Sequence, residues 1–146
     1  MSYCISMTFF KATEILDSQF ESNSPAQILA AFDNIDWTKQ IAWSMLEEHQ
    51  GEFFDFKIEH IHSGRNIAGL LMVYDRLQYH FHVEAALYQK QEKSYLFGLI
   101  KSNKLPTFES EYVPFKEFRQ GLKSFLDGND QAVQLMCETY FPTASR

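Results

Sequence analysis

The middle of the chain, from Phe53 to Lys101, has the apolar and polar pattern of four consecutive β-strands. Phe53–His62 and Tyr79–Tyr88 alternate strictly, as expected for strands with one face in the core and the other in water. Ile67–Tyr74 is continuously apolar, which favours a central strand covered on both faces. Ser94–Lys101, rich in aromatic and aliphatic residues, is expected to form the fourth strand.

The segments on either side of this region are less uniform. Tyr3–Phe9 alternates in the same way and is expected to add one more strand to the sheet. In Lys11–Phe20 the apolar residues fit a short helical turn, although the segment has no clear cap. Ser102–Val113 contains a proline and turn-forming residues, and we expect a loop there that folds over a sheet edge or the mouth of a cleft.

Two helices are expected before the central region, because each has a recognisable start. Ser24 can accept a hydrogen bond from an unpaired amide at the start of a helix over Pro25–Asp33. Asp36 can cap a second helix that runs from Trp37 to Gln50 and ends at Gly51. Glu47 and Glu48 would then lie at the end of the helix where the dipole disfavours acids.

Two further helices are expected near the end of the chain. Pro114 opens the first, and Gly128 ends it. Its apolar residues recur at helical spacing and predict packing on the sheet: Phe115, Phe118, Leu122, Phe125 and Leu126. The last short helix covers 132–136. Together these patterns predict one α+β domain over residues 1–146, with an antiparallel sheet of about five strands and helices packed mainly on one face.

Composition and charge exclude several classes of function. The net charge is -6 for 146 residues, and no basic stripe is present, so we expect no binding to nucleic acid. No apolar run reaches about 18 residues and no basic residue precedes Lys11, so neither a membrane span nor a secretory signal is predicted. Cys4 and Cys137 lack CxxC spacing, which favours free thiols and a cytoplasmic location.

No catalytic motif is visible in the chain. The six glycines are scattered singly, so no phosphate-binding loop is formed, and GxSxG, HExxH and GxGxxG are all absent. The sequence therefore favours a protein that is not an enzyme and needs no cofactor.

Four histidines form two HxH pairs, His60 with His62 and His80 with His82, and Glu84 follows two residues later. An HxH pair on a strand places both imidazoles on one face, as in many sheet-built metal sites. Strand parity separates the pairs, because His60 and His62 share the apolar face of their strand whereas His80, His82 and Glu84 lie opposite theirs. Only a β-bulge would bring all four together.

The leading functional hypothesis is binding to a basic protein, as a toxin-neutralising immunity protein does. Acidic residues predominate in the first 50 residues, and 16% of the chain is aromatic. The candidate partner-binding residues are Glu14, Asp17, Asp33, Asp36, Trp37, Glu47 and Glu48.

Two alternatives remain open. One is a small-molecule-binding domain or metal-dependent enzyme that uses the His60/His62 and His80/His82 strands, with His80, His82 and Glu84 as metal ligands. The other is a structural subunit that pairs across a dimer through an uncovered strand. The oligomeric state is not predicted.

Overall fold

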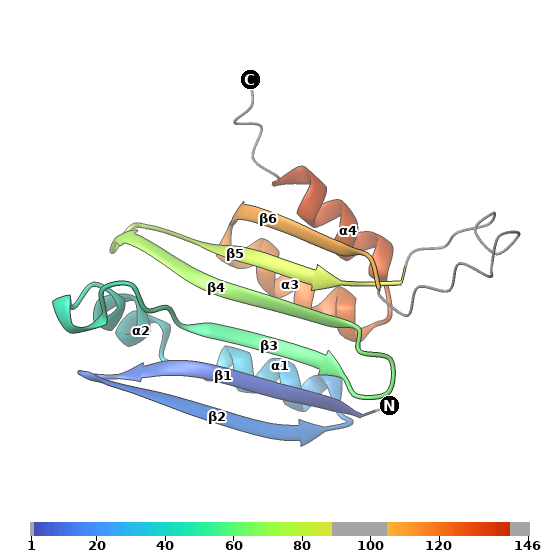
Figure 1. The fold of residues 1–146 in the computed structure, drawn as a ribbon, viewed down its shortest axis with the longest axis horizontal. Helices are drawn as coiled ribbons and strands as arrows, with labels where there is room; N and C mark the ends of the chain where they lie inside the picture. The colour runs from blue at the N-terminus through green and yellow to red at the C-terminus, as the bar shows by residue number, and fades with distance from the viewer. Residues whose placement is uncertain (1, 89–104, 141–146) are drawn as a thin grey trace, which may run out of the picture.

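The computed structural model describes residues 2–88 and 105–140, and its centre is a six-stranded antiparallel sheet (Figure 1). The strand order is β2-β1-β3-β4-β5-β6. The strands are β1 (Tyr3–Lys11), β2 (Glu14–Ser22), β3 (Asp55–His60), β4 (Asn66–Asp75), β5 (Gln78–Ala86) and β6 (Thr107–Val113). The helices are α1 (Pro25–Asp33), α2 (Trp37–Ser44), α3 (Phe115–Leu126) and α4 (Asp130–Thr139), with a short 3₁₀ helix, η1, at Glu47–His49.

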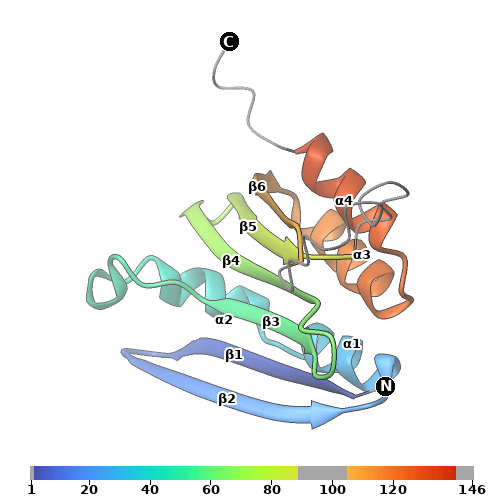
Figure 2. The ribbon, with the colours of Figure 1, turned by 45° about the vertical axis from the view of Figure 1, so that its right-hand side comes forward.

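The four α-helices lie on one face of the sheet, as the two views in Figures 1 and 2 show. Helices α1 and α2 lie behind the part of the sheet that holds β1 and β3, and α3 and α4 lie behind β4, β5 and β6. The expected α+β class, antiparallel sheet and one-sided helical layer are confirmed, and the sheet has one strand more than the five expected. No helix in the described part of the chain is both long enough and apolar enough to span a membrane.

Aromatic rings fill the space between the sheet and the helices. The ring of Phe32 in α1 lies within 6.3 Å of five others, measured between centroids. Those rings come from Trp37, Phe56, Phe81, Phe115 and Phe118. Edge-to-face and tilted arrangements predominate, and such pairs add roughly 0.5–1.5 kcal/mol each beyond the apolar area that they bury. Many of the aromatic residues of the sequence therefore lie in the core.

Helix α3 lies very close to the sheet at Gly69 in β4. A Cβ atom built on Gly69 would lie 2.7 Å from Cε2 of Phe118, well inside van der Waals contact. The Phe118 ring also stacks at 4.3 Å on Phe81 of the next strand. A glycine at this point is what allows α3 to settle against the centre of the sheet.

Lys11–Phe20, which the sequence left ambiguous, is not a helical turn, because this segment turns tightly and continues as strand β2. Lys11 pairs with Glu14, so Ala12 and Thr13 alone connect the two strands. Ala12 has a φ of 55°, in the left-handed region that hairpin turns require and that glycine or asparagine usually supplies. The turn is held from outside, since the Gln40 side chain bonds both the N–H and the C=O of Phe10, at 2.9 and 2.8 Å.

Four further expectations need correction or lie outside the described residues. The helix that begins at Trp37 ends at Ser44 rather than Gln50, so Glu47 and Glu48 open the separate turn η1. The predicted loop at Ser102–Val113 contains strand β6. Among the described residues, helices cover the central strand β4 on only one face. The strand predicted at Ser94–Lys101 falls outside the described residues.

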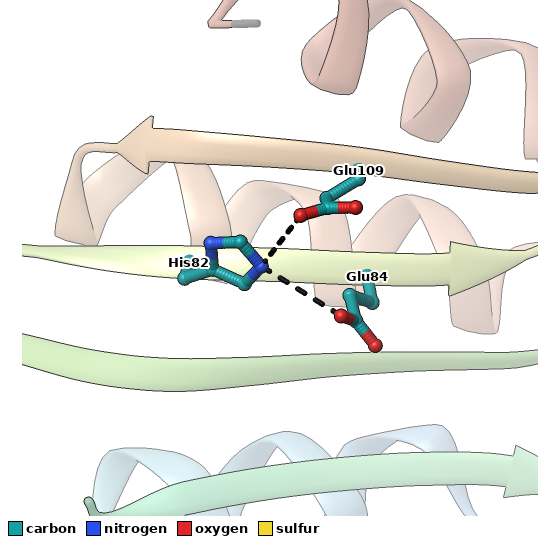
Figure 3. A group of neighbouring side chains, drawn as sticks. All are labelled: His82, Glu84 and Glu109. Atoms are coloured by element: carbon teal, nitrogen blue, oxygen red, sulfur yellow. Dashed lines mark ion pairs between the residues drawn. The ribbon is translucent and has the colours of Figure 1, made fainter. Parts of the chain in front are cut away.

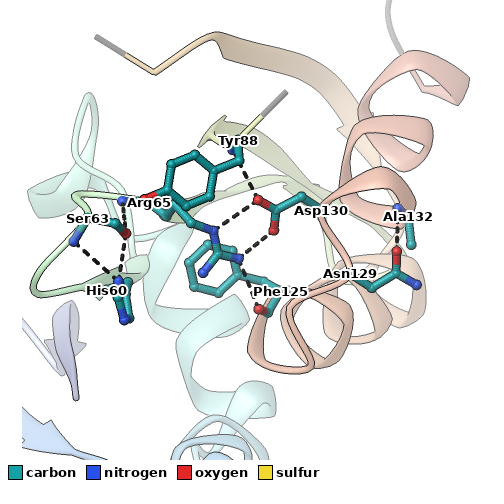
Figure 4. A network of polar contacts seen from close by, with 8 residues as sticks. All are labelled: His60, Ser63, Arg65, Tyr88, Phe125, Asn129, Asp130 and Ala132. Atoms are coloured by element: carbon teal, nitrogen blue, oxygen red, sulfur yellow. Dashed lines mark hydrogen bonds and ion pairs between the residues drawn. The ribbon is translucent and has the colours of Figure 1, made fainter. Parts of the chain in front are cut away.

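A buried ion pair fixes the β3–β4 turn to the turn between α3 and α4 (Figure 4). Arg65 is 5% exposed, and its guanidinium donates to both carboxylate oxygens of Asp130. It also donates to the C=O of Phe125 at 3.3 Å and lies 4.5 Å from the centre of that ring. Asp130 in turn accepts the backbone N–H of Tyr88 at 3.0 Å. Four separate segments therefore meet at one charge pair.

Replacing Gly69 with Ala should lower the free energy of unfolding by about 1–3 kcal/mol, because the new methyl group overlaps the Phe118 ring. Chemical denaturation measures this change. Ala68→Ser, one residue away on the opposite face, is the control and should shift stability by under about 0.5 kcal/mol. If the clash is the cause, Phe118→Leu combined with Gly69→Ala should cost less than the sum of the two single changes.

Replacing Arg65 with Met should lower the free energy of unfolding by about 3–5 kcal/mol, since Asp130 is left charged and without its partner. The matched control is Arg119→Met. Arg119 pairs with Asp33 at 2.7 Å, but both side chains are about two-fifths exposed, at 39% and 42%. Loss of that surface pair should cost under about 1 kcal/mol. Equal effects of the two changes would contradict the structural role given to Arg65.

Candidate functional site

The face of the sheet opposite the helices is the candidate functional surface, and we call it the open face. Within residues 2–88 and 105–140, none of the four α-helices lies on it. Because directly paired residues of antiparallel strands point to the same side, the register assigns its side chains. Three rows of paired residues cross it: Glu21-Cys4-Glu59-Asn66-Ala86-Thr107, then Gln19-Ser6-Lys57-Ala68-Glu84-Glu109, then Asp17-Thr8-Asp55-Leu70-His82.

The open face is strongly acidic. Each row carries two carboxylates, and Lys57 is the one lysine or arginine in the three rows. Neighbouring strands lie about 4.8 Å apart, so carboxylates two strands apart in a row are separated by roughly 10 Å. At such distances the charges of the carboxylates add to give one region of negative electrostatic potential over the open face.

A shallow hollow of about 380 Å³ lies in the centre of this face. Small side chains, including Ser6, Thr8 and Ala68, leave the space, and Asp55, Lys57 and His82 are among the longer side chains around it. The hollow therefore offers an acid, a base and an imidazole to a group that enters from solvent.

Asp55 is the most perturbed carboxyl on the open face. Its side chain is half-buried, and burial raises its pKa above the ordinary value of 3.8. The N–H of Thr8 donates to its Oδ1 at 3.2 Å and acts in the opposite direction, as does the nearby charge of Lys57. The negative charge of Asp17 raises the pKa further. Asp55 is thus a carboxyl group that has lost part of its hydration on folding, and the loss disfavours its ionised form.

Three side chains converge at the β5–β6 side of the open face (Figure 3). Nε2 of His82 lies 3.1 Å from Oε1 of Glu109 and 3.7 Å from Oε1 of Glu84. His82 and Glu84 are neighbours on one face of β5, as their spacing predicts. Glu109 comes from β6 and sits directly opposite Glu84. The sequence did not point to Glu109, because its segment was expected to be a loop.

The other histidines do not join this group. His80 is on the same face of β5, but its ring packs between Tyr74 and Tyr112, with centroids 5.3 and 4.9 Å away. Burial lowers the pKa of His80, so its ring is neutral at pH 7. His60 pairs with Tyr3, a buried residue, and its Nδ1 contacts Ser63. Strand parity predicted that His60 lies on the opposite face of the sheet from His80 and His82, and the structure has this arrangement.

The seven residues predicted to bind a partner are not gathered on one surface. Asp17 lies on the open face, whereas Glu14 begins β2 beside the hairpin turn and Glu47 and Glu48 are exposed in η1. Trp37 is packed in the core, and its Nε1 donates to the C=O of Phe32 at 3.1 Å.

The remaining two acids of that set have structural partners. Asp36 caps α2 by accepting the N–H of Lys39 at 3.2 Å. Asp33 accepts two hydrogen bonds from Arg119, which hold the pKa of Asp33 below its ordinary value. The acidic residues of β3, β5 and β6 contribute more to a common surface than the acidic helices do.

Comparison of the chain with models of protein families, with curated proteins and with solved structures finds no match. The functional argument therefore depends on the geometry of the open face.

Asp55→Asn should raise the free energy of unfolding at about pH 7, because an amide fits the same site without the cost of a half-buried charge. A carboxyl whose pKa is raised by folding ionises first in the unfolded chain, so its destabilising effect grows as pH rises from 3.8 through the higher folded-state pKa. The advantage of Asn should therefore be smallest near pH 3 and larger at neutral pH. Denaturation curves at both pH values test this, and an equal advantage at both would contradict it.

Proposed function

We propose that the protein is a non-enzymatic binding protein, and that the open face of its sheet binds a basic surface of a protein partner. The observation that carries this proposal is the row pattern, in which three successive rows each present two carboxylates and only Lys57 opposes them. Charge complementarity of this kind selects partners and speeds their association.

The hollow gives the proposed interface a specific anchor point. A lysine or arginine side chain of the partner that enters it would meet the carboxylates of Asp55 and Glu84, which both line the hollow. Asp55 has already lost part of its hydration on folding, so an incoming cation has less water to displace than at a fully exposed acid. Restoring a counter-charge would also remove the destabilisation that the buried carboxylate causes.

The same features fit the specific case of an immunity protein that neutralises a basic toxin domain in the cytoplasm. Such a protein must present a preformed acidic surface, and strand residues held by a packed sheet are fixed more firmly than residues on loops. The one-sided helical layer leaves such a surface on β1 to β6 without any rearrangement of the core.

Removing three charges from the open face should weaken partner binding, whereas removing three charges elsewhere should not. The open-face variant combines Asp17→Asn, Glu21→Gln and Glu59→Gln. The matched control combines Glu14→Gln, Glu47→Gln and Glu48→Gln, which lie outside the three rows and change the net charge equally. Three exposed ion pairs account for up to about 3 kcal/mol, so affinity should fall by up to roughly 100-fold.

The measurement is affinity capture from host lysate with each variant at about 50 mM and 500 mM salt, followed by titration of the captured protein. We expect a basic protein that is retained by the wild type and the control at low salt and lost by the open-face variant. Equal capture by both variants, or a partner that binds equally at high salt, would contradict the proposal.

A further inference from the structure

We propose that His82, Glu84 and Glu109 form a binding site for one divalent transition-metal ion, such as Zn²⁺, on the open face. This inference goes beyond the proposed partner binding and does not depend on it. The site has two ligands on β5 and one on β6, and Figure 3 shows all three side chains directed toward a common point.

The spacing of the ligand atoms fits one ion. Zinc bonds to imidazole nitrogen and carboxylate oxygen are about 2.0–2.2 Å long, so two ligands of a tetrahedral site lie roughly 3.3–3.5 Å apart. The distances from Nε2 of His82 to the two glutamate oxygens, 3.1 and 3.7 Å, lie on either side of that value. All three ligand atoms lie within 4.8 Å of one another. Only small rotations of the glutamates are needed to close the site.

The three side chains differ in exposure. His82 is only 20% exposed, so its ring has less room to move than the glutamate side chains have. Glu84 and Glu109 are 67% and 56% exposed, so both can adjust to the ion at little cost in packing. The backbone register fixes their starting positions, because Glu84 and Glu109 are a directly opposed pair of the β5–β6 ladder.

The charges favour a divalent cation. Two carboxylates and a neutral imidazole balance a charge of +2, and they relieve the repulsion of two acids opposed across a strand pair. Lys57 is the nearest base in the same row, and β4 separates it from Glu84, which places it about 10 Å away. An imidazole in the set selects zinc, cobalt or nickel over magnesium and calcium.

One of the three metal ligands suggested by the sequence differs from those in the structure. His80 was grouped with His82 and Glu84, but the rings of Tyr74 and Tyr112 enclose it and its nitrogen is not part of the cluster. Glu109 takes its place. The site thus has three protein ligands and a position open to water or to a side chain of a partner.

The experiment uses the full chain without a histidine tag, freed of metal with a chelator. Zn²⁺ binding is measured by calorimetry, and Co²⁺ is titrated for its visible spectrum, which reports the ligand geometry. The test variants are His82→Ala and Glu109→Gln. The matched controls are His80→Ala on the same strand and His62→Ala, which removes an exposed imidazole elsewhere.

We expect one ion per chain for the wild type and both controls. Loss of a ligand should weaken binding by at least about tenfold, since even loss of a residue that only orients a ligand has an effect of that size. Glu109 is exposed, so its variant should fold normally, and circular dichroism checks this. No Zn²⁺ binding by the wild type, or binding by Glu109→Gln and His82→Ala that is as tight as that of the wild type, would overturn the proposal.

Failure of this site can be separated from failure of partner binding. The open-face variant used for partner capture leaves His82, Glu84 and Glu109 intact, so it should bind zinc as the wild type does. Loss of zinc binding in that variant would count against the assignment of the site to these three residues.

Discussion

The contact between the Phe118 ring and Gly69 determines how the helical layer sits on the sheet. A side chain at position 69 would push α3 outward, whereas glycine lets the ring reach the backbone of β4 and stack on Phe81. The aromatic cluster continues from Phe118 to Phe32 in α1. This contact joins the pair α1 and α2 to the pair α3 and α4 on the same face of the sheet. The three rows of the opposite face contain no Phe, Tyr or Trp side chain, and each of them presents two carboxylates.

Much of this fold could be predicted from hydrophobic period and helix caps, because Ser24 and Asp36 accept the amide hydrogen bonds that such caps are known for. The β1–β2 hairpin could not, since its turn uses Ala12 at positive φ where a glycine or asparagine would have signalled it. Gln40, which is 30 residues from Phe10 in the chain, bonds the strand just before the turn, and Nε2 of His49 contacts the C=O of Ala12 in the turn itself. Such distant contacts leave no trace in a local pattern.

The candidate site was predictable only within single strands. Parity placed His82 and Glu84 on the polar face of their strand, and it separated them from His60. The third member, Glu109, depends on β6 pairing next to β5, which no periodicity reveals. The acidic face as a whole has the same origin: Asp17, Asp55 and His82 become neighbours in one row only after four strand pairings are made. Charge counted along the chain pointed instead to the helices.

The most direct test of the open face as the working surface is carboxyl footprinting of the chain, alone and with the basic protein that it captures. A carbodiimide modifies accessible Asp and Glu side chains, and mass spectrometry reads the extent at each residue. The account predicts that the partner protects Asp17, Glu21 and Glu59 and leaves Glu47 and Glu48 as reactive as before. Protection of η1 and the helices, with unchanged labelling across β1 to β3, would contradict it.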